Sequence, residues 1–278
     1  MNNRLPIREA FRAAYAHGLR HYLLIVSALL VMGLTVVGLA IVPVSLIMTG
    51  IYGAKAYGLA TFFGAAGSLL AVVALFAIIF LLNGLGLGWS KFILDIIDGK
   101  KPRIATLFHY FSKGGRLMLA EALIFLPLVL VIKAGIILIL FNKEALNQVI
   151  QANPPYGGMI VAGPALAALL VGVFVTVIIS IRLFFISYLI VDQDKGAVST
   201  ISASYHLTKG HMLRLFFVML LSMVVGMVLN KGLGLLLGGL INDKILGYLG
   251  TAINVLVFTP FFSLVYAYLY RFLTNNKN

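Results

Sequence analysis

The chain has 278 residues, of which 62% are hydrophobic and 10% are charged, and its mean hydropathy is +1.07. Soluble domains are usually about 45–50% apolar and about 25% charged, so this composition excludes a water-soluble protein. The formal charge of +13 does not require nucleic acid, because the basic residues flank apolar stretches and fit a topology signal with attraction to anionic lipid head groups.

Six stretches are long and apolar enough to cross a membrane, since a spanning helix needs about 20 mostly apolar residues. These are residues 23–48, 62–87, 117–141, 159–191, 213–229 and 248–270. The stretch 232–241 (GLGLLLGGLI) could span the membrane, re-enter it or extend the fifth helix. The first apolar run is too long for a cleavable signal peptide, so we expect it to remain as a membrane helix. We predict an all-α polytopic membrane helical bundle in a single domain, residues 1–278.

The basic residues favour an orientation with both termini in the cytoplasm. Cytoplasmic loops of membrane proteins carry an excess of Lys and Arg. With the N-terminus inside, the outside loops hold only Lys55, Lys143, Lys231 and Lys244. The inside segments then hold Arg4, Arg8, Arg12, Arg20, Lys91, Lys100, Lys101, Arg103, Lys113, Arg116, Lys195, Lys209, Arg214, Arg271 and Lys277.

A repeat relates the basic segments that precede three of the spans. The pairs His17-Gly18, Lys113-Gly114 and Lys209-Gly210 follow one another at a spacing of 96 residues, and Asp98 and Asp194 share this spacing. Self-similarity at a fixed period indicates repeated structural units. We predict three units, at about residues 1–88, 89–191 and 192–278, each with an interfacial amphipathic helix, a glycine turn and a helical hairpin.

Apolar residues at helical spacing mark the three amphipathic helices. The apolar faces are Ile7, Ala10, Phe11, Ala14 and Tyr15; Ile104, Leu107, Phe108 and Phe111; and, more weakly, Val198, Ile201 and Tyr205. These helices could lie against lipid or pack under the bundle as a cap, and the Ser/Thr-rich third helix is expected to bind lipid least well. The predicted anionic-lipid contacts are Arg4, Arg8, Arg12, Lys100, Lys101 and Arg103.

The stretch from Tyr188 to Gly196, the following Ser-rich segment with Lys209-Gly210, and the closing Tyr268–Arg271 carry a family resemblance. They resemble the YciC-like (UPF0259) family of bacterial inner-membrane proteins, and are similar to the membrane domain of some glycerophosphodiester phosphodiesterases. The resemblance implies a six-span protein of the bacterial inner membrane with a role in envelope maintenance. It transfers no active site, because phosphodiesterase activity belongs to a separate soluble domain.

Three charged residues, Glu121, Lys133 and Arg182, fall within predicted spans, where a charge is costly and usually marks function or pairing. Glu121 and Arg182 differ in depth by only about 8 Å at the rise of an α-helix, so we hypothesise an ion pair between them. The alternative is that each reaches separately to the interface. Lys133 has no acidic partner at its depth and either extends outward or faces a water-filled cavity.

Two pairs of carboxylates, Asp95 with Asp98 and Asp192 with Asp194, precede the second and third basic segments. Beside Lys and Arg they could hold Mg²⁺ against a phosphate in a lipid-modifying enzyme, but they are more simply explained as turn and N-cap residues. The chain has no cysteine and no motif of a zinc protease, phosphate loop or serine hydrolase. The expectation is therefore no catalytic residue, no metal and no cofactor.

The leading interpretation is a non-enzymatic membrane protein that is structural or lipid-associated. Its expected partners are anionic lipids and a further membrane protein, without nucleic acid. The rival interpretation is a small-solute or ion transporter or channel, which requires a polar pathway and usually broken helices. Asn83, Asn230 and Asn254 are expected to join helices rather than line such a pathway.

Overall fold

The computed structural model describes the chain except for residues 1–4, 57–59, 142–146, 149–150, 153–170, 238–241 and 277–278. The described residues form helices and turns, with no strand among them, as predicted. The longer helices are α1 (Ile7–Ala56), α2 (Ala60–Ile97), α4 (Gly114–Phe141), a helical segment over 171–182, α9 (Met212–Leu237) and α11 (Thr259–Asn275). The shorter ones are α3 (Thr106–His109), α7 (Ile186–Gln193), α8 (Ala197–Thr208) and α10 (Asp243–Ile253). A 3₁₀ turn, η1 (Phe111–Lys113), and a π-helix, η2 (Asn254–Phe258), complete them.

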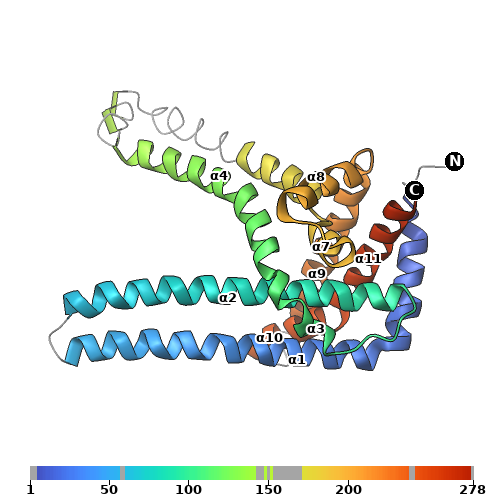
Figure 1. Ribbon diagram of the computed structural model, residues 1–278, viewed down its shortest axis with the longest axis horizontal. Coiled ribbons are helices and arrows are strands. Elements are labelled where there is room, and N and C mark those ends of the chain that lie inside the picture. The colour runs from blue at the N-terminus through green and yellow to red at the C-terminus, as the bar shows by residue number, and fades with distance from the viewer. Residues whose placement is uncertain are drawn as a thin grey trace.

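The bundle contains the helices of a multi-pass membrane protein. Within the described residues, five segments are long and apolar enough to span: Ile7–Leu39, Val73–Ile97, Val171–Gln193, Met212–Leu229 and Gly247–Asn275. The remaining predicted span, 117–141, lies on the 28-residue helix α4. Helix α4 bends along its length (Figure 1), and it contains Pro127, which cannot donate a backbone hydrogen bond.

Of the three predicted glycine turns, that at Gly210 is formed, whereas Gly114 has a helical φ of −54° and begins α4, so the turn predicted there is wrong. Helix α1 runs without interruption through Gly18, so the turn predicted at Gly18 is wrong. The helix changes direction near its N-terminal end and then lies beside α2 as a long hairpin (Figure 1). Gly18 has no positive φ, whereas Gly210 in the third unit has a φ of +83° and ends a helix there. A continuous helix therefore replaces the helix–turn–helix arrangement in the first unit.

The fifth and sixth predicted spans show where the stretch 232–241 belongs and where the last span departs from a regular α-helix. The described part of the stretch 232–241 continues α9 as far as Leu237, so it extends the fifth helix. The final span is not uniform, because the π-helix η2 separates α10 from α11. Pro260 lies in the first turn of α11, where a missing N–H costs least.

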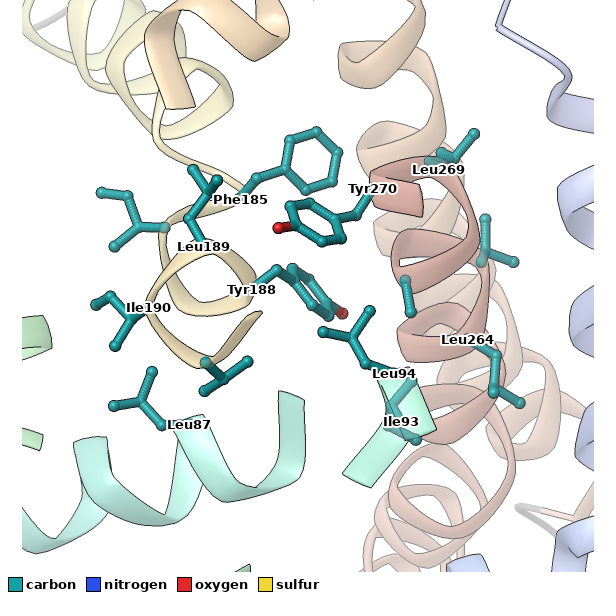
Figure 2. Close-up of a cluster of buried hydrophobic side chains, with 14 of the residues drawn as sticks. Leu87, Ile93, Leu94, Phe185, Tyr188, Leu189, Ile190, Leu264, Leu269 and Tyr270 are labelled. Carbon is teal, nitrogen blue, oxygen red and sulfur yellow. The ribbon is translucent and has the colours of Figure 1, made fainter. Parts of the chain in front are cut away.

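Among the residues whose burial the structure describes, a large hydrophobic cluster gathers where α2, α7 and α11 meet (Figure 2). Leu87, Ile93 and Leu94 of α2 meet Phe185–Ile190 of α7 and Leu264–Tyr270 of α11 there. The rings of Tyr188 and Tyr270 stack between α7 and α11, with centroids 5.4 Å apart. The start of α1 packs on α11 in the same cluster. We call this region the junction end, because it also holds the two junctions, residues 98–116 and 194–212, that precede α4 and α9.

Candidate functional site

The second junction, residues 98–116, docks on α2 through backbone contacts at glycine. A Cβ atom on Gly88 of α2 would collide with the backbone of Leu107, and one on Gly114 would lie 2.6 Å from the carbonyl oxygen of Phe80. Leu107 is therefore fully buried against α2. Glycine is required at these positions because any side chain would separate two backbones in contact. Gly84 and Gly88 thus permit the close approach of the second junction to α2, whereas a Cβ on Gly86 would meet nothing within 4 Å.

The third junction, residues 194–212, docks on a break in the fourth span. Residues 183–185 form a turn between the helical segment 171–182 and α7. The N–H of Ile186 donates to Leu183 at 3.1 Å, which leaves the carbonyl of Arg182 without the usual helical donor. The Ser204 hydroxyl of α8 donates to this oxygen at 2.8 Å, with Thr208 at 3.5 Å. Helix α8 therefore caps a broken membrane helix.

The hydroxyl-bearing face of α8 faces inward. Thr200, Ser204 and Thr208, spaced four residues apart, are fully buried. Val198 and Tyr205, on the predicted apolar face, are 69% and 48% exposed, so these side chains do not pack under the bundle and their contact with lipid stays a prediction. The inward face is polar because the orphan carbonyl of Arg182 needs hydroxyl donors, and an unsatisfied buried backbone group costs about 1–3 kcal/mol.

Arg271 of α11 joins the ends of two other helices. Its guanidinium donates to both carboxylate oxygens of Asp98, after α2, at 2.7 Å, and to Asp192, in the last turn of α7, at 2.7 Å. Tyr270 donates its hydroxyl to Asp192 at 2.9 Å. The three charged side chains are only 17–21% exposed. A fork of this geometry is strong and directional, so Arg271 holds α2, α7 and α11 in one arrangement.

Asp194 links the two junctions at the surface. It accepts from Lys113, the last residue of η1, at 2.8 Å and from Arg116, in the first turn of α4, at 2.6 Å. These hydrogen bonds lower the pKa of Asp194 from its ordinary value of 3.8. Its φ of +51° makes it the left-handed C-cap of α7, so the turn prediction holds but the N-cap role passes to Gly196. Gly99 is likewise the positive-φ residue after Asp98.

The carboxylates considered for Mg²⁺ thus lie in ion pairs in the structure. Asp95 pairs with Lys91 at 3.0 Å, and Asp98, Asp192 and Asp194 bind the basic groups described above. Among the described residues, no group of three or more His, Asp and Glu side chains is placed to hold a metal ion. In this arrangement the four aspartates connect helices to one another.

Glu121 lines a cavity of mixed polar and apolar character between α2, α4 and the broken fourth span. The cavity has a volume of about 420 Å³. Its polar lining residues are Asn83, Ser90, Glu121, Ser180 and Ser187, and Leu183 and Phe184 of the break also line it. Asn83 donates to Glu121 at 2.9 Å across the α2–α4 contact, which is the helix-joining role predicted for Asn83. Asn83 binds one carboxylate oxygen of Glu121, and the carboxylate forms no ion pair within the described structure.

The hypothesised ion pair between Glu121 and Arg182 is wrong. Glu121 bonds to Asn83, whereas the guanidinium of Arg182 lies over the ring of Tyr205, 4.6 Å from its centroid. The error arose because depth along two helices does not fix which way their side chains point. One guanidinium nitrogen of Arg182 is buried and has no hydrogen-bond partner among the described residues. The side chain of Lys133 lies outside the described structure.

A family model describes almost the whole chain. The family of unknown function DUF975 matches residues 20–277. The chain belongs to this family. No curated protein and no solved structure matches it. The family description names neither the YciC-like family nor a phosphodiesterase membrane domain, so that resemblance stays a prediction.

In this DUF975 member, the predicted lipid-contact residues lie at the junction end. Arg8 and Arg12 are exposed on α1, beside the buried Ala10 and Ala14, and Arg4 lies outside the described residues. The loop after α2 exposes three more: Lys100, Lys101 and Arg103. Lys100 also approaches Asp98 at 3.5 Å, whereas no ion pair is found for Lys101 or Arg103 among the described residues.

Two organising contacts of this DUF975 protein escaped prediction. Arg271 was counted only as a topology charge, although the motif Tyr268–Arg271 gave a sequence signal that its position matters. The break at residues 183–185 was missed because the residues around it are mostly apolar and include no Gly or Pro that would signal an interruption of the helix. The serines and threonines of α8, spaced by four, were the available signal that a buried acceptor lay opposite them.

Proposed function

We propose that the protein is a non-enzymatic, lipid-associated membrane protein of the bacterial inner membrane, which holds anionic phospholipid against its junction end and serves envelope maintenance. In this proposal the junction end faces the cytoplasm, as the distribution of basic residues favours. The phospholipid head groups are its main partners, and a further membrane protein is a second one. No cofactor or nucleic acid takes part.

One observation carries the proposal: the charge at the junction end is unbalanced after the ion pairs are formed. The aspartates there are already paired, Asp95 with Lys91, Asp98 and Asp192 with Arg271, and Asp194 with Lys113 and Arg116. The basic side chains left over point outward: Arg8, Arg12, Lys101 and Arg103 are exposed. Each basic residue near an anionic membrane surface contributes about 1 kcal/mol of attraction.

Native mass spectrometry of the protein in a gentle detergent tests the proposal. The variant Arg8→Gln/Arg12→Gln/Lys101→Gln/Arg103→Gln removes four exposed charges without touching an ion pair. Its control, Lys55→Gln/Lys143→Gln/Lys231→Gln/Lys244→Gln, removes four charges from the predicted outside loops. We expect the first variant to lose co-purified phosphatidylglycerol and cardiolipin and the control to keep them. Equal retention by wild type and both variants would overturn the proposal.

The cavity at Glu121 favours a second candidate function, transport of a small solute or ion. Transporters place their sites beside discontinuous helices near the membrane midplane, and an ionisable residue there marks a pathway. The cavity combines Glu121 with the break at Leu183 and Phe184. Proteoliposomes loaded with Na⁺, K⁺ or a pH-sensitive dye test this function. Flux that is lost in Glu121→Gln, but kept in the exposed-residue control Glu9→Gln, would establish it.

A further inference from the structure

An apolar groove of about 450 Å³ lies between the helical segment 171–182 and the start of α9. Its walls include Val173, Phe174, Val177, Ile181, Leu213 and Phe216, and no polar side chain lines it. Several of these side chains are also widely exposed, Phe174 at 66% and Leu213 at 72%. In a bilayer such a groove is open to hydrocarbon, so its shape and lining fit an acyl chain.

Arg182 is the residue next to this groove in sequence, at the start of the break on which the third junction docks. It follows Ile181, the last groove residue on its segment, and the groove residue Met212 begins α9 directly after the junction. The guanidinium carbon of Arg182 lies over the ring of Tyr205 of α8, 4.6 Å from its centroid. Such a cation–π contact does not use up the N–H donors of the guanidinium, which can still bind an acceptor.

The charge of Arg182 has no acid to neutralise it within the described part of the chain. An arginine keeps its charge in proteins, so a partly buried guanidinium such as that of Arg182 favours a neighbouring anion. Glu121 is bound to Asn83, and Asp192 and Asp194 bind Arg271, Lys113 and Arg116. One buried nitrogen of Arg182 still has no partner among the described residues. The anion that complements it therefore comes from outside this part of the protein.

We propose that the groove and Arg182 form a binding site for one anionic phospholipid, with an acyl chain in the groove and the phosphate on the Arg182 guanidinium. The proposal rests on the lipid-associated function above and gives it a defined site. Guanidinium groups bind phosphate through paired N–H donors, and the neighbouring groove supplies the apolar contact that a free phosphate would not use. The bound lipid would also explain why a charged residue is tolerated at the edge of the bundle.

Titration with phosphatidylglycerol, followed by native mass spectrometry, tests the head-group half of the site. Arg182→Gln removes the charge but keeps the backbone carbonyl that Ser204 caps. We expect the affinity for the first phosphatidylglycerol to fall by about tenfold or more, as for loss of a charge-assisted contact, with phosphatidylethanolamine binding unchanged. Arg182→Lys, which keeps the charge without the planar fork, should recover part of the affinity.

A groove-filling pair of variants tests the acyl-chain half and does not depend on Arg182→Gln folding. Val177 lines the groove and Val175 does not, although both are on the same helical segment and are 37% exposed. We expect Val177→Trp to lose the same phospholipid and Val175→Trp to keep it. Unchanged phosphatidylglycerol binding in both Arg182→Gln and Val177→Trp overturns the site. Loss of lipid from the four-charge variant alone would then leave the proposed function standing without this site.

Discussion

The second and third junctions occupy equivalent places in the chain, since Gly114 and Gly210 are 96 residues apart, yet they dock in different ways. The second packs on an intact helix, α2, whose backbone hydrogen bonds are complete, and it needs only the space that Gly88 leaves for Leu107. The third packs on a broken helix and supplies the missing donors through Ser204 and Thr208.

This comparison explains why the two junction sequences diverge although their spacing is kept. An intact helix presents no free acceptor, so the segment docked on it can be apolar, as Leu107 is. A broken helix within a membrane exposes a carbonyl that water cannot reach, so the segment docked on it must carry hydroxyls. The break also places Leu183 and Phe184 beside the Glu121 cavity, so this cavity and the hydroxyl-rich cap have one origin.

Arg271→Gln should have the largest effect on stability, because it loosens the starts of both junctions together. It leaves Asp98 and Asp192 partly buried without their main partner, and breaking a buried ion pair costs about 3–5 kcal/mol. Unfolding in dodecyl sulfate, followed by circular dichroism, measures the loss. The exposed-residue variant Arg12→Gln is the control. A loss no greater than that of the control would show that Arg271 does not hold the helices together.

Gly88→Ala should disrupt the second junction only, at a cost of about 3 kcal/mol, since overpacking against a backbone cannot be relieved by a side-chain rotation. Gly86→Ala is the matched control, because a Cβ there meets nothing within 4 Å and the substitution favours the helix. The same unfolding assay should place the two variants on opposite sides of wild type. Similar stabilities for the two would contradict the close contact with Leu107.

Ser204→Ala should weaken the third junction only, by about 2 kcal/mol, because it leaves the Arg182 carbonyl with only the longer Thr208 bond. Ser202→Ala, at an exposed position of α8, is its control and should be neutral. Hydrogen exchange of the α8 and α9 amides should rise in Ser204→Ala and stay unchanged around α3. Faster exchange at both junctions would show that the two are not independent.

The smallest effect is expected from Asp194, whose exposed ion pairs bridge the junctions. Its pKa lies below 3.8, so its contribution is present above that pH and is lost as the pH falls through the lowered pKa. Thermal melting of wild type and Asp194→Asn in detergent should differ slightly at pH 6 and converge below the lowered pKa. A difference that persists or grows in acid would refute the role assigned to the carboxylate.

The helical class and most spans could be predicted from the sequence, because span length and hydrophobicity follow directly from the thickness of the bilayer. The continuous course of α1 through Gly18 could not, since a glycine is also tolerated inside a helix when packing supports it. Nor could the break at residues 183–185 be read from an apolar run, because its cause is a tertiary contact with Ser204. Hydrophobic periodicity and composition predict single helices, whereas a break in a helix depends on the elements that pack against it.

The sequence predicted several residues of the candidate site but not how they pair. Glu121 and Arg182 stood out because charges in spans are rare. Asn83 was expected to join helices, but neither its pairing with Glu121 nor that of Arg182 with Tyr205 could be predicted from a sequence pattern. Asp98 and Asp192 were noticed as possible metal ligands, and the structure gives them Arg271 instead. Pairing across such sequence separations is a property of the folded bundle and could not follow from spacing.

The hydrogen bonds of Arg271 can form only late in the synthesis of the chain. Arg271 follows Asp98 by 173 residues and Asp192 by 79. At about 5–20 residues per second, the ribosome delivers Arg271 on the order of ten seconds or more after Asp98. Until then the two aspartates at the ends of α2 and α7 lack this cation. The inserted helices are therefore locked together only when α11 has arrived, which makes the last span the step that completes assembly in the membrane.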